Sequence, residues 1–254
     1  MPHNPIAAGD LARFPFALEQ AGLAAWPALE QQHLNGWCLR YTNGYTKRAN
    51  SVNAVTEVQT LTPHELGRIE GFYSARAAPC IFRLVSAGVA PQVDQFLADR
   101  GYRFVDPSIV LTRPLLKLDQ VSVPNEQQEL AQWLQHYMAI TGAPLQGQML
   151  HQQLLQLIQG PKYLALAMQA QQPVACALGV MHGGLLGLFD VATAADFRGQ
   201  GHARALCQQL MAWGQAQGAE QAFLQVTASN EAAIRLYESM GFRRSYQYGY
   251  RIQP

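Results

Sequence analysis

The sequence has few charged side chains. Asp, Glu, Lys and Arg make up 14% of the 254 residues, and the formal net charge is +1 at pH 7. A protein that binds nucleic acid or an anionic membrane mainly through charge needs a basic excess, so this composition argues against both partners. Hydrophobic residues make up 49% of the chain, which is enough for a sizeable core and gives no sign of disorder.

Long apolar runs and an export signal are also missing. No run of about eighteen apolar residues occurs, so we expect no segment to span a membrane. The first ten residues, MPHNPIAAGD, have neither the basic segment nor the long apolar segment of a secretory signal. The sequence therefore predicts a cytoplasmic protein.

Cysteine is scarce as well. The chain has four cysteines, which lie far apart within apolar runs: Cys38, Cys80, Cys176 and Cys207. Their separation does not match the ligand spacing of a metal site, and it favours buried free thiols over a disulfide framework. We expect no bound metal.

The most informative stretch is Leu188–Ala203, LFDVATAADFRGQGHA. An apolar segment over 185–193 leads into a polar turn with Gly199 and Gly201, and a helical pattern begins directly afterwards. The free N–H groups and dipole of a helix N-terminus attract anions, and glycine lets an anion approach the backbone. On these residues alone, an ordinary corner between a strand and a helix is an equally good interpretation.

The order of residues in the turn narrows the choice. The three glycines of a dinucleotide site and the Gly-Lys-Ser/Thr of a P-loop are both missing. The turn instead reads Arg-x-x-Gly-x-Ala over 198–203, and it resembles the acetyl-CoA signature of the GCN5-related N-acetyltransferases (GNAT family). Residues 230–242 resemble the family's second signature, Asn-x-x-Ala-x-x-Leu-Tyr-x-x-x-Gly-Phe, at every fixed position.

The resemblance implies a GNAT fold of the α/β (α+β) class, in which helices flank a mixed central sheet. It also implies acetyl-CoA as the cosubstrate. The turn is then expected to bind the pyrophosphate of CoA through its backbone N–H groups. The residues that the resemblance assigns to this role are Arg198, at the mouth of the turn, and Gly199, Gly201, His202 and Ala203.

The pantetheine arm of CoA has its own predicted residues. In the family this arm pairs with the strand before the turn, which corresponds here to Val191 and Thr193. Asn230 matches a family position whose polar side chain meets the arm, and a plain N-cap is an equally good interpretation of it. The family usually has Val-x-Pro before the turn, whereas this chain has Thr193–Ala195, without the proline.

The resemblance assigns proton transfer to Tyr237. A CoA thiolate leaves readily only if it is protonated as it departs, and a phenol within hydrogen-bond reach can supply that proton. The alternative is a core aromatic, since Tyr237 shares one helix face with Ala233, Leu236 and Met240. No general base stands out among Asp190, Asp196 and Glu57, and deprotonation of the acceptor through water is an alternative.

The predicted function is an acetyl-CoA-dependent N-acetyltransferase that acts on a primary amine of a small molecule or a peptide. The alternative functions are a non-catalytic acyl-CoA-binding or sensing module and an enzyme that uses another acyl-CoA or a hydroxyl acceptor. Neither nucleic acid nor a membrane is expected as a partner. The sequence leaves a monomer and a homodimer equally open.

Periodicity and turn residues give the order of elements in the second half. From Asn125 to Ile252 the chain reads as two helices, three strands, a helix, a strand, a helix and a last strand or hairpin. Before any resemblance is used, this order already matches the GNAT fold. Strand alternation sends Asp190 to the face opposite Val191.

The first half of the chain contains an echo of the second. Ala98–Arg103 resembles Glu238–Arg243, since each reads as a helix end, a glycine, an aromatic residue and an arginine before a strand. The echo predicts two tandem GNAT-like domains, a degenerate one over 1–118 and an acetyl-CoA-binding one over 119–254. The first domain lacks the Arg-x-x-Gly-x-Ala turn, so we expect no nucleotide there. We expect 114–124 to connect the domains, with the option of a shared strand.

Several elements of the first half follow from turn and cap residues. Asn43 and Gly44 predict a hairpin, followed by a solvated arm that begins at Tyr45. Thr62 and Pro63 predict the start of a helix. We also expect residues 45–53 to form part of the wall of an acceptor cleft.

Overall fold

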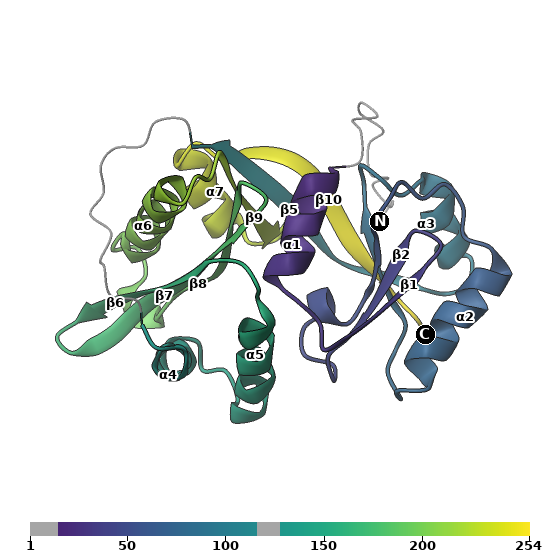
Figure 1. The fold of residues 1–254 in the computed structure, drawn as a ribbon, viewed down its shortest axis with the longest axis horizontal. Coiled ribbons are helices and arrows are strands. Elements are labelled where there is room, and N and C mark those ends of the chain that lie inside the picture. Colours follow the sequence, from purple (N-terminus) through teal and green to yellow (C-terminus); the bar gives the residue numbers. More distant parts are fainter. Residues whose placement is uncertain (1–14, 116–127) are drawn as a thin grey trace.

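The computed structural model describes residues 15–115, here called the first half, and residues 128–254, called the second half. All named strands of these residues lie in one mixed sheet, in the order β1-β2-β3-β4-β10-β5-β9-β8-β7-β6. In Figure 1 this sheet runs from β1 and β2 at the right to β6 at the left, with helices on both faces. The predicted fold class, a mixed central sheet flanked by helices, is confirmed.

The first half contains α1 (Phe16–Ala25), β1 (Glu30–Leu34), β2 (Trp37–Tyr41), η1 (Lys47–Ala49), β3 (Val52–Ala54), α2 (Pro63–Ser74), β4 (Ile81–Val85), α3 (Pro91–Ala98) and β5 (Arg103–Pro114). Helix α2 begins where the sequence predicted. Thr62 and Glu65 form a reciprocal capping box there, because each side chain accepts the other residue's backbone N–H.

The second half contains α4 (Leu130–Thr141), α5 (Leu145–Leu157), β6 (Lys162–Gln169), β7 (Gln172–His182), β8 (Leu185–Thr193), η2 (Ala195–Phe197), α6 (His202–Ala216), β9 (Gln221–Thr227), α7 (Glu231–Ser239) and β10 (Arg243–Ile252). The predicted order of elements is confirmed. β10 is one long strand with two register irregularities against β5. The predicted start of α4 near Asn125 lies outside the described residues.

The turn predicted at Asn43 and Gly44 forms, because both residues have positive φ and the backbone N–H of Tyr45 donates to the carbonyl of Thr42 at 2.8 Å. It lies in the loop that joins β2 to its antiparallel neighbour β3, and their pairing begins at Leu39 and Val52. A second tight turn, which the sequence analysis did not predict, lies at Asn35 and Gly36 and joins β1 to β2. After the turn at Gly44 the chain folds back on itself, and Asn50 Oδ1 accepts the backbone N–H groups of Thr42 (2.7 Å) and Gly44 (3.0 Å).

The segment after Gly44 is therefore no solvated arm. It folds into η1, and the residues that follow it, Asn50 to Ala54, are buried. The polar residues of this segment had indicated that it is exposed to solvent. The structure instead uses the side chain of Asn50 to hydrogen-bond the backbone of a packed loop.

The two halves exchange strands. β5 of the first half pairs with β9, from Ser108 opposite Thr227 to Pro114 opposite Gln221. β10 of the second half pairs with β4, and β5 and β10 run antiparallel beside each other at the centre of the sheet (Figure 1). Each half of the sheet is thus completed by a strand of the other half. The predicted boundary at 118/119 lies outside the described residues, so the division into two domains stays a prediction.

The echo in the sequence corresponds to two turns of the same construction. Gly101 and Gly241 both have positive φ, +81° and +89°, and each ends a helix. The next residue donates its backbone N–H back into that helix, from Tyr102 to Leu97 at 3.1 Å and from Phe242 to Tyr237 at 3.1 Å. The turn at Gly101 leads into β5 and the turn at Gly241 leads into β10, which are the two exchanged strands.

The helices bury separate clusters on the sheet. α6 and α7 cover one face of the second half, and α1, α4 and α5 cover the other. α2 and α3 pack on the first half. Helix α1, although it belongs to the first half, contacts β7 and β8, so both halves build the same layer. Cys38, Cys80, Cys176 and Cys207 are buried free thiols, as predicted.

None of the described helices is long and apolar enough to cross a membrane.

The exchanged strands generate a testable prediction. A protease site inserted between residues 118 and 119 lets the chain be cut between the halves. We expect both fragments to stay together in gel filtration after cleavage and to separate only in denaturant, because β5 and β10 are each held by strands of the other fragment. Fragment 119–254 produced alone lacks β5, so it should show no cooperative thermal unfolding by circular dichroism. Two fragments that part after cleavage and fold independently would contradict the prediction.

Candidate functional site

The main irregularity of the sheet is a gap between β8 and β9. The two strands pair in parallel from Leu185–Gln221 to Leu188–Leu224, and beyond these pairs the described residues of β8 and β9 are no longer joined. β8 continues to Thr193 beside β7, and β9 continues to Thr227 beside β5. A strand edge that is not paired with its neighbour can accept an extended ligand.

A β-bulge lies in β8 where the gap opens. Between the pairs Leu178–Phe189 and Cys176–Ala192, β8 has two residues where β7 has one. The extra residue is Asp190, whose φ is +49°. A bulge bends the strand that carries it, so Asp190 marks the point where β8 turns away from β9.

The Asp190 carboxylate is buried on the face of the sheet that α1, α4 and α5 cover. His151 Nε2 of α5 lies 2.8 Å from Asp190 Oδ2, and both side chains are almost fully buried. Tyr137, Trp26, Tyr45 and Trp133 surround the imidazole of His151, with ring centroids 4.9 to 6.3 Å from it. The sequence analysis missed His151, because a single histidine on a helix gives no spacing signal.

The predicted pantetheine residues lie at the gap. Val191 is half-buried and packs against the cluster under α6 and α7, on the face opposite Asp190, as alternation predicted. The carbonyl of Thr193 accepts a hydrogen bond from Arg198 Nε at 3.4 Å. The strand edge and the turn that follows it are thus joined by Arg198.

The predicted phosphate turn exposes two glycines directly before helix α6. Gly199 and Gly201 are exposed, with φ of +75° and +86°, and a Cβ placed on either would meet no protein atom within 4 Å. Gly201 caps α6 without a side-chain hydrogen bond, so the first N–H groups of the helix are available. His202, the first residue of α6, has a buried Nε2 without a partner among the described residues.

Helix α7 brings the other two predicted residues to the same side. Asn230 Oδ1 accepts the backbone N–H of Ala233 at 3.2 Å, so the plain N-cap interpretation of Asn230 is correct as far as this bond goes. Tyr237 is 7% exposed, and its ring meets that of Phe242 edge-on, with the ring centroids 5.9 Å apart. Tyr237 is therefore part of the core, as the alternative interpretation required.

The hydroxyl of Tyr237 is less enclosed by the core than its ring. Within the described part of the chain it has no hydrogen-bond partner, and it is not among the buried unpaired atoms, so it reaches the surface of the core. Burial, with a smaller effect of the Cys207 thiol, raises the pKa of Tyr237 well above its usual value. Burial thus disfavours the phenolate and keeps the hydroxyl protonated.

A cavity of about 210 Å³ lies on the opposite face of the sheet. Gln225 and Thr227 of β9 line it, and they alternate with Leu224 and Val226, which point into the cluster under α6 and α7. The cavity therefore borders β9 where that strand has parted from β8. The other lining residues come from both halves: Thr46, Lys47, Arg48, Asp106, Ser108, Tyr248 and Tyr250.

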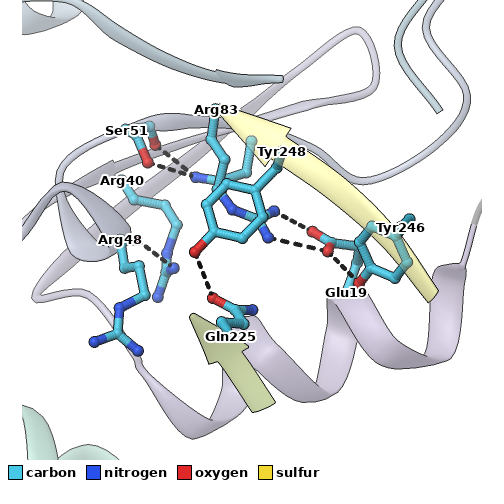
Figure 2. Close-up of polar contacts among 9 residues, drawn as sticks. Glu19, Arg40, Arg48, Ser51, Arg83, Gln225, Tyr246 and Tyr248 are labelled. Carbon is cyan, nitrogen blue, oxygen red and sulfur yellow. Dashed lines mark hydrogen bonds and ion pairs between the residues drawn. The ribbon is translucent and has the colours of Figure 1, made fainter. Parts of the chain in front are cut away.

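Figure 2 shows how polar contacts hold this region together. Tyr248 of β10 donates to Gln225 Oε1 at 3.1 Å, and the Arg83 guanidinium lies 3.8 Å over the Tyr248 ring. Arg83 in turn pairs with Glu19 of α1, which also accepts a hydrogen bond from Tyr246 at 2.6 Å. Residues 45–53, predicted as a cleft wall, contribute three residues to the cavity.

The general-base candidates do not come together at the gap. Glu57 is exposed, and its neighbour Val58 packs in the separate cluster under α2 and α3. Asp196 is exposed in η2, beside the phosphate turn. Of the carboxylates considered, Asp190 alone lies in the strand that borders the gap.

Known proteins resemble this chain along most of its length. A family model described as "Probable histone acetyltransferase Rv0428c C-terminal" matches residues 16–251. The "Uncharacterized N-acetyltransferase YobR" of Bacillus subtilis is 27% identical over 246 residues, which cover 93% of this chain and 97% of that protein.

Solved structures share the fold. A GCN5-related N-acetyltransferase from Kribbella flavida has a TM-score of 0.68 at 19% identity, with 94% of this chain and 93% of that chain covered. A tandem GNAT protein from the clavulanic acid biosynthesis pathway has a TM-score of 0.58 at 10% identity, with 74% and 68% covered. Together with the family model, these similarities show that the chain belongs to the GCN5-related N-acetyltransferases, within the family that the model describes.

Proposed function

We propose that this protein is an acetyl-CoA-dependent N-acetyltransferase that transfers the acetyl group to a primary amine. The observation that carries the proposal is the gap between β8 and β9, which has the glycine turn at its end and the Tyr237 phenol on helix α7. Membership in an acetyltransferase family supports the same reaction class.

In this proposal the cofactor lies along the open edge of β8. Backbone groups of Val191 and Thr193 pair with the amides of the pantetheine arm, as a neighbouring strand would. The N–H groups of Gly199, Gly201, His202 and Ala203 bind the pyrophosphate, helped by the helix dipole, with Arg198 beside them. Asn230 keeps its role as a cap and presents its amide nitrogen to the arm.

The chemistry is a direct attack of the acceptor amine on the thioester carbonyl. The new C–N bond forms, the C–S bond breaks, and the sulfur leaves as a thiolate that takes a proton. Tyr237 supplies that proton in this proposal, because a phenol is protonated at neutral pH and this hydroxyl has no competing partner among the described residues. Positioned acids of this kind typically contribute about 10²- to 10⁴-fold to a rate.

The glycine turn gives a prediction about CoA binding. Gly201→Ala places a methyl group where a phosphate must contact the backbone, so we expect CoA affinity to fall by at least about tenfold, or roughly 1.4 kcal/mol. Isothermal titration calorimetry with CoA measures this change.

The same variant strains the backbone, and a control must separate that effect. Gly218, just after α6, has the same φ of +86° and equally open surroundings. Gly218→Ala should lower the thermal stability about as much as Gly201→Ala, by roughly 1–2 kcal/mol for a left-handed residue, while CoA binding stays unchanged. Unchanged CoA affinity in Gly201→Ala would remove the pyrophosphate assignment.

The Tyr237 phenol gives a prediction about the rate of acetyl transfer. Tyr237→Phe keeps the ring and its packing and removes only the hydroxyl, so we expect kcat to fall about 10- to 1,000-fold with CoA affinity within about threefold of wild type. Single-turnover kinetics with acetyl-CoA and an accepted amine measures the chemical step.

A change of leaving group is the control for Tyr237. A donor thioester with a more acidic thiol needs less help to leave, so the rate difference between wild type and Tyr237→Phe should narrow with it. Thermal unfolding should change by no more than about 1 kcal/mol, since the hydroxyl makes no hydrogen bond in the described residues. A near-wild-type chemical step in Tyr237→Phe would leave this residue as a core aromatic only.

A further inference from the structure

We propose that the acceptor amine also carries a carboxylate, as an amino acid does, and that Arg48 binds this carboxylate in the cavity beside β9. The inference rests on the proposed function for the reaction, and it names the class of acceptor. Arg48 is half-buried, follows the Gly44 turn in η1, and lines both the 210 Å³ cavity and a smaller one of about 10 Å³ next to it.

The charges around these two cavities do not balance. The cavities are lined by four basic side chains but by only two carboxylates. The basic residues are Arg40, Lys47, Arg48 and Arg83, and the acidic ones are Glu19 and Asp106. Glu19 is already engaged by Arg83 and Tyr246, and Asp106 lies 2.7 Å from Lys47. Neither carboxylate is available to the remaining two cations, Arg40 and Arg48.

Arg40 is a structural cation. It is fully buried, its terminal nitrogens donate to the backbone carbonyls of Arg48, Leu23 and Trp26, and burial lowers its pKa to about 10. Its Nε and the Oδ1 of Asn53, both at the smaller cavity, are buried without a partner in the described residues. Arg40 therefore adds positive potential behind Arg48 and is itself committed to the fold.

The guanidinium of Arg48 packs against aromatic rings but has no carboxylate partner among the described residues. Its guanidinium lies over the Trp26 ring at 4.5 Å and near the Phe189 ring at 5.9 Å. The described residues offer it neither an ion pair nor a side-chain hydrogen bond, although Figure 2 shows its backbone carbonyl accepting from Arg40. A guanidinium stacked on a ring keeps its N–H fork free, and that fork matches a carboxylate in two parallel hydrogen bonds.

The anion that Arg48 binds is not a cofactor phosphate. Gln225 and Thr227 place the cavity on the α1 face of the sheet, whereas the glycine turn opens α6 on the other face. The cavity borders β9 beyond its last pair with β8, so a molecule bound there lies next to the gap. Hydroxyl groups of Thr46, Ser108 and Thr227 line the same space and suit a small polar molecule.

Acceptor pairs that differ only in the carboxylate test the inference. Amino acids and their amides, such as glycine with glycinamide and alanine with alaninamide, are compared by the rate of CoA release from acetyl-CoA. We expect kcat/KM to be at least about tenfold higher for the acid of an accepted pair. Arg48→Gln should remove that preference, and Arg48→Lys should restore part of it, because lysine keeps the charge and loses the fork.

Arg100→Gln is the matched control. Arg100 also stacks on a ring, at 3.5 Å from that of Phe96, but it lies just after α3 in the first half, away from the cavity. This variant should keep the wild-type ratio between acid and amide. An equal ratio in the wild type and in Arg48→Gln would overturn the inference and leave the proposed acetyl transfer intact.

A binding measurement keeps the inference testable if no amine is turned over. N-acetylglycine and N-acetylalanine, with their amides, are titrated into the full chain by calorimetry. Binding of an acid but not of its amide, lost in Arg48→Gln and kept in Arg100→Gln, supports the carboxylate site independently of turnover. Binding of the acid that is unaffected by Arg48→Gln contradicts it.

Discussion

The antiparallel pairing of β5 with β10 is the constraint on which the rest of the structure depends. Each strand leaves its own half and completes the sheet of the other, so the ladder between them closes one continuous sheet. The pairing of β4 with β10 and of β5 with β9 follows from it. Because backbone hydrogen bonds fix the register, the exchange also fixes where η1 and α1 of the first half meet β9 and β10 of the second.

A buried charge reinforces this junction. Glu19 of α1, Arg83 of β4 and Tyr246 of β10 meet in one cluster, and each comes from a different element of the interlocked sheet. A buried ion pair contributes little net stability by itself, since desolvation offsets the attraction, but removal of one partner leaves an unpaired buried charge. The cluster therefore specifies how α1 lies on the sheet more than it adds free energy.

In the proposed function, the two faces of the sheet at the gap between β8 and β9 have different roles. The glycine turn and α6 lie on one side, and the cavity with Arg48 lies on the other. The bulge at Asp190, whose carboxylate contacts His151, bends β8 at the point where the gap begins. In the proposed reaction the cofactor and the acceptor approach the gap from opposite faces, which leaves the thioester as their meeting point.

The sequence by itself determined the elements of the second half and the backbone of the glycine turn. Apolar periodicity, caps and glycines act over a few residues, so these elements could be predicted from the letters alone. The roles of Arg198–Ala203, Asn230 and Tyr237 came from the resemblance to the family signatures and stay predictions. The strand exchange, the pairing of His151 with Asp190 and the cavity of Arg48 were decided by the tertiary structure. The turn at Asn43 and Gly44 formed as its residues indicated, but the packed loop after it was not predicted, since the contacts of Asn50 that hold it exist only in the fold. Contacts between residues far apart in the chain leave no periodic trace in it, and only the folded sheet brings them together.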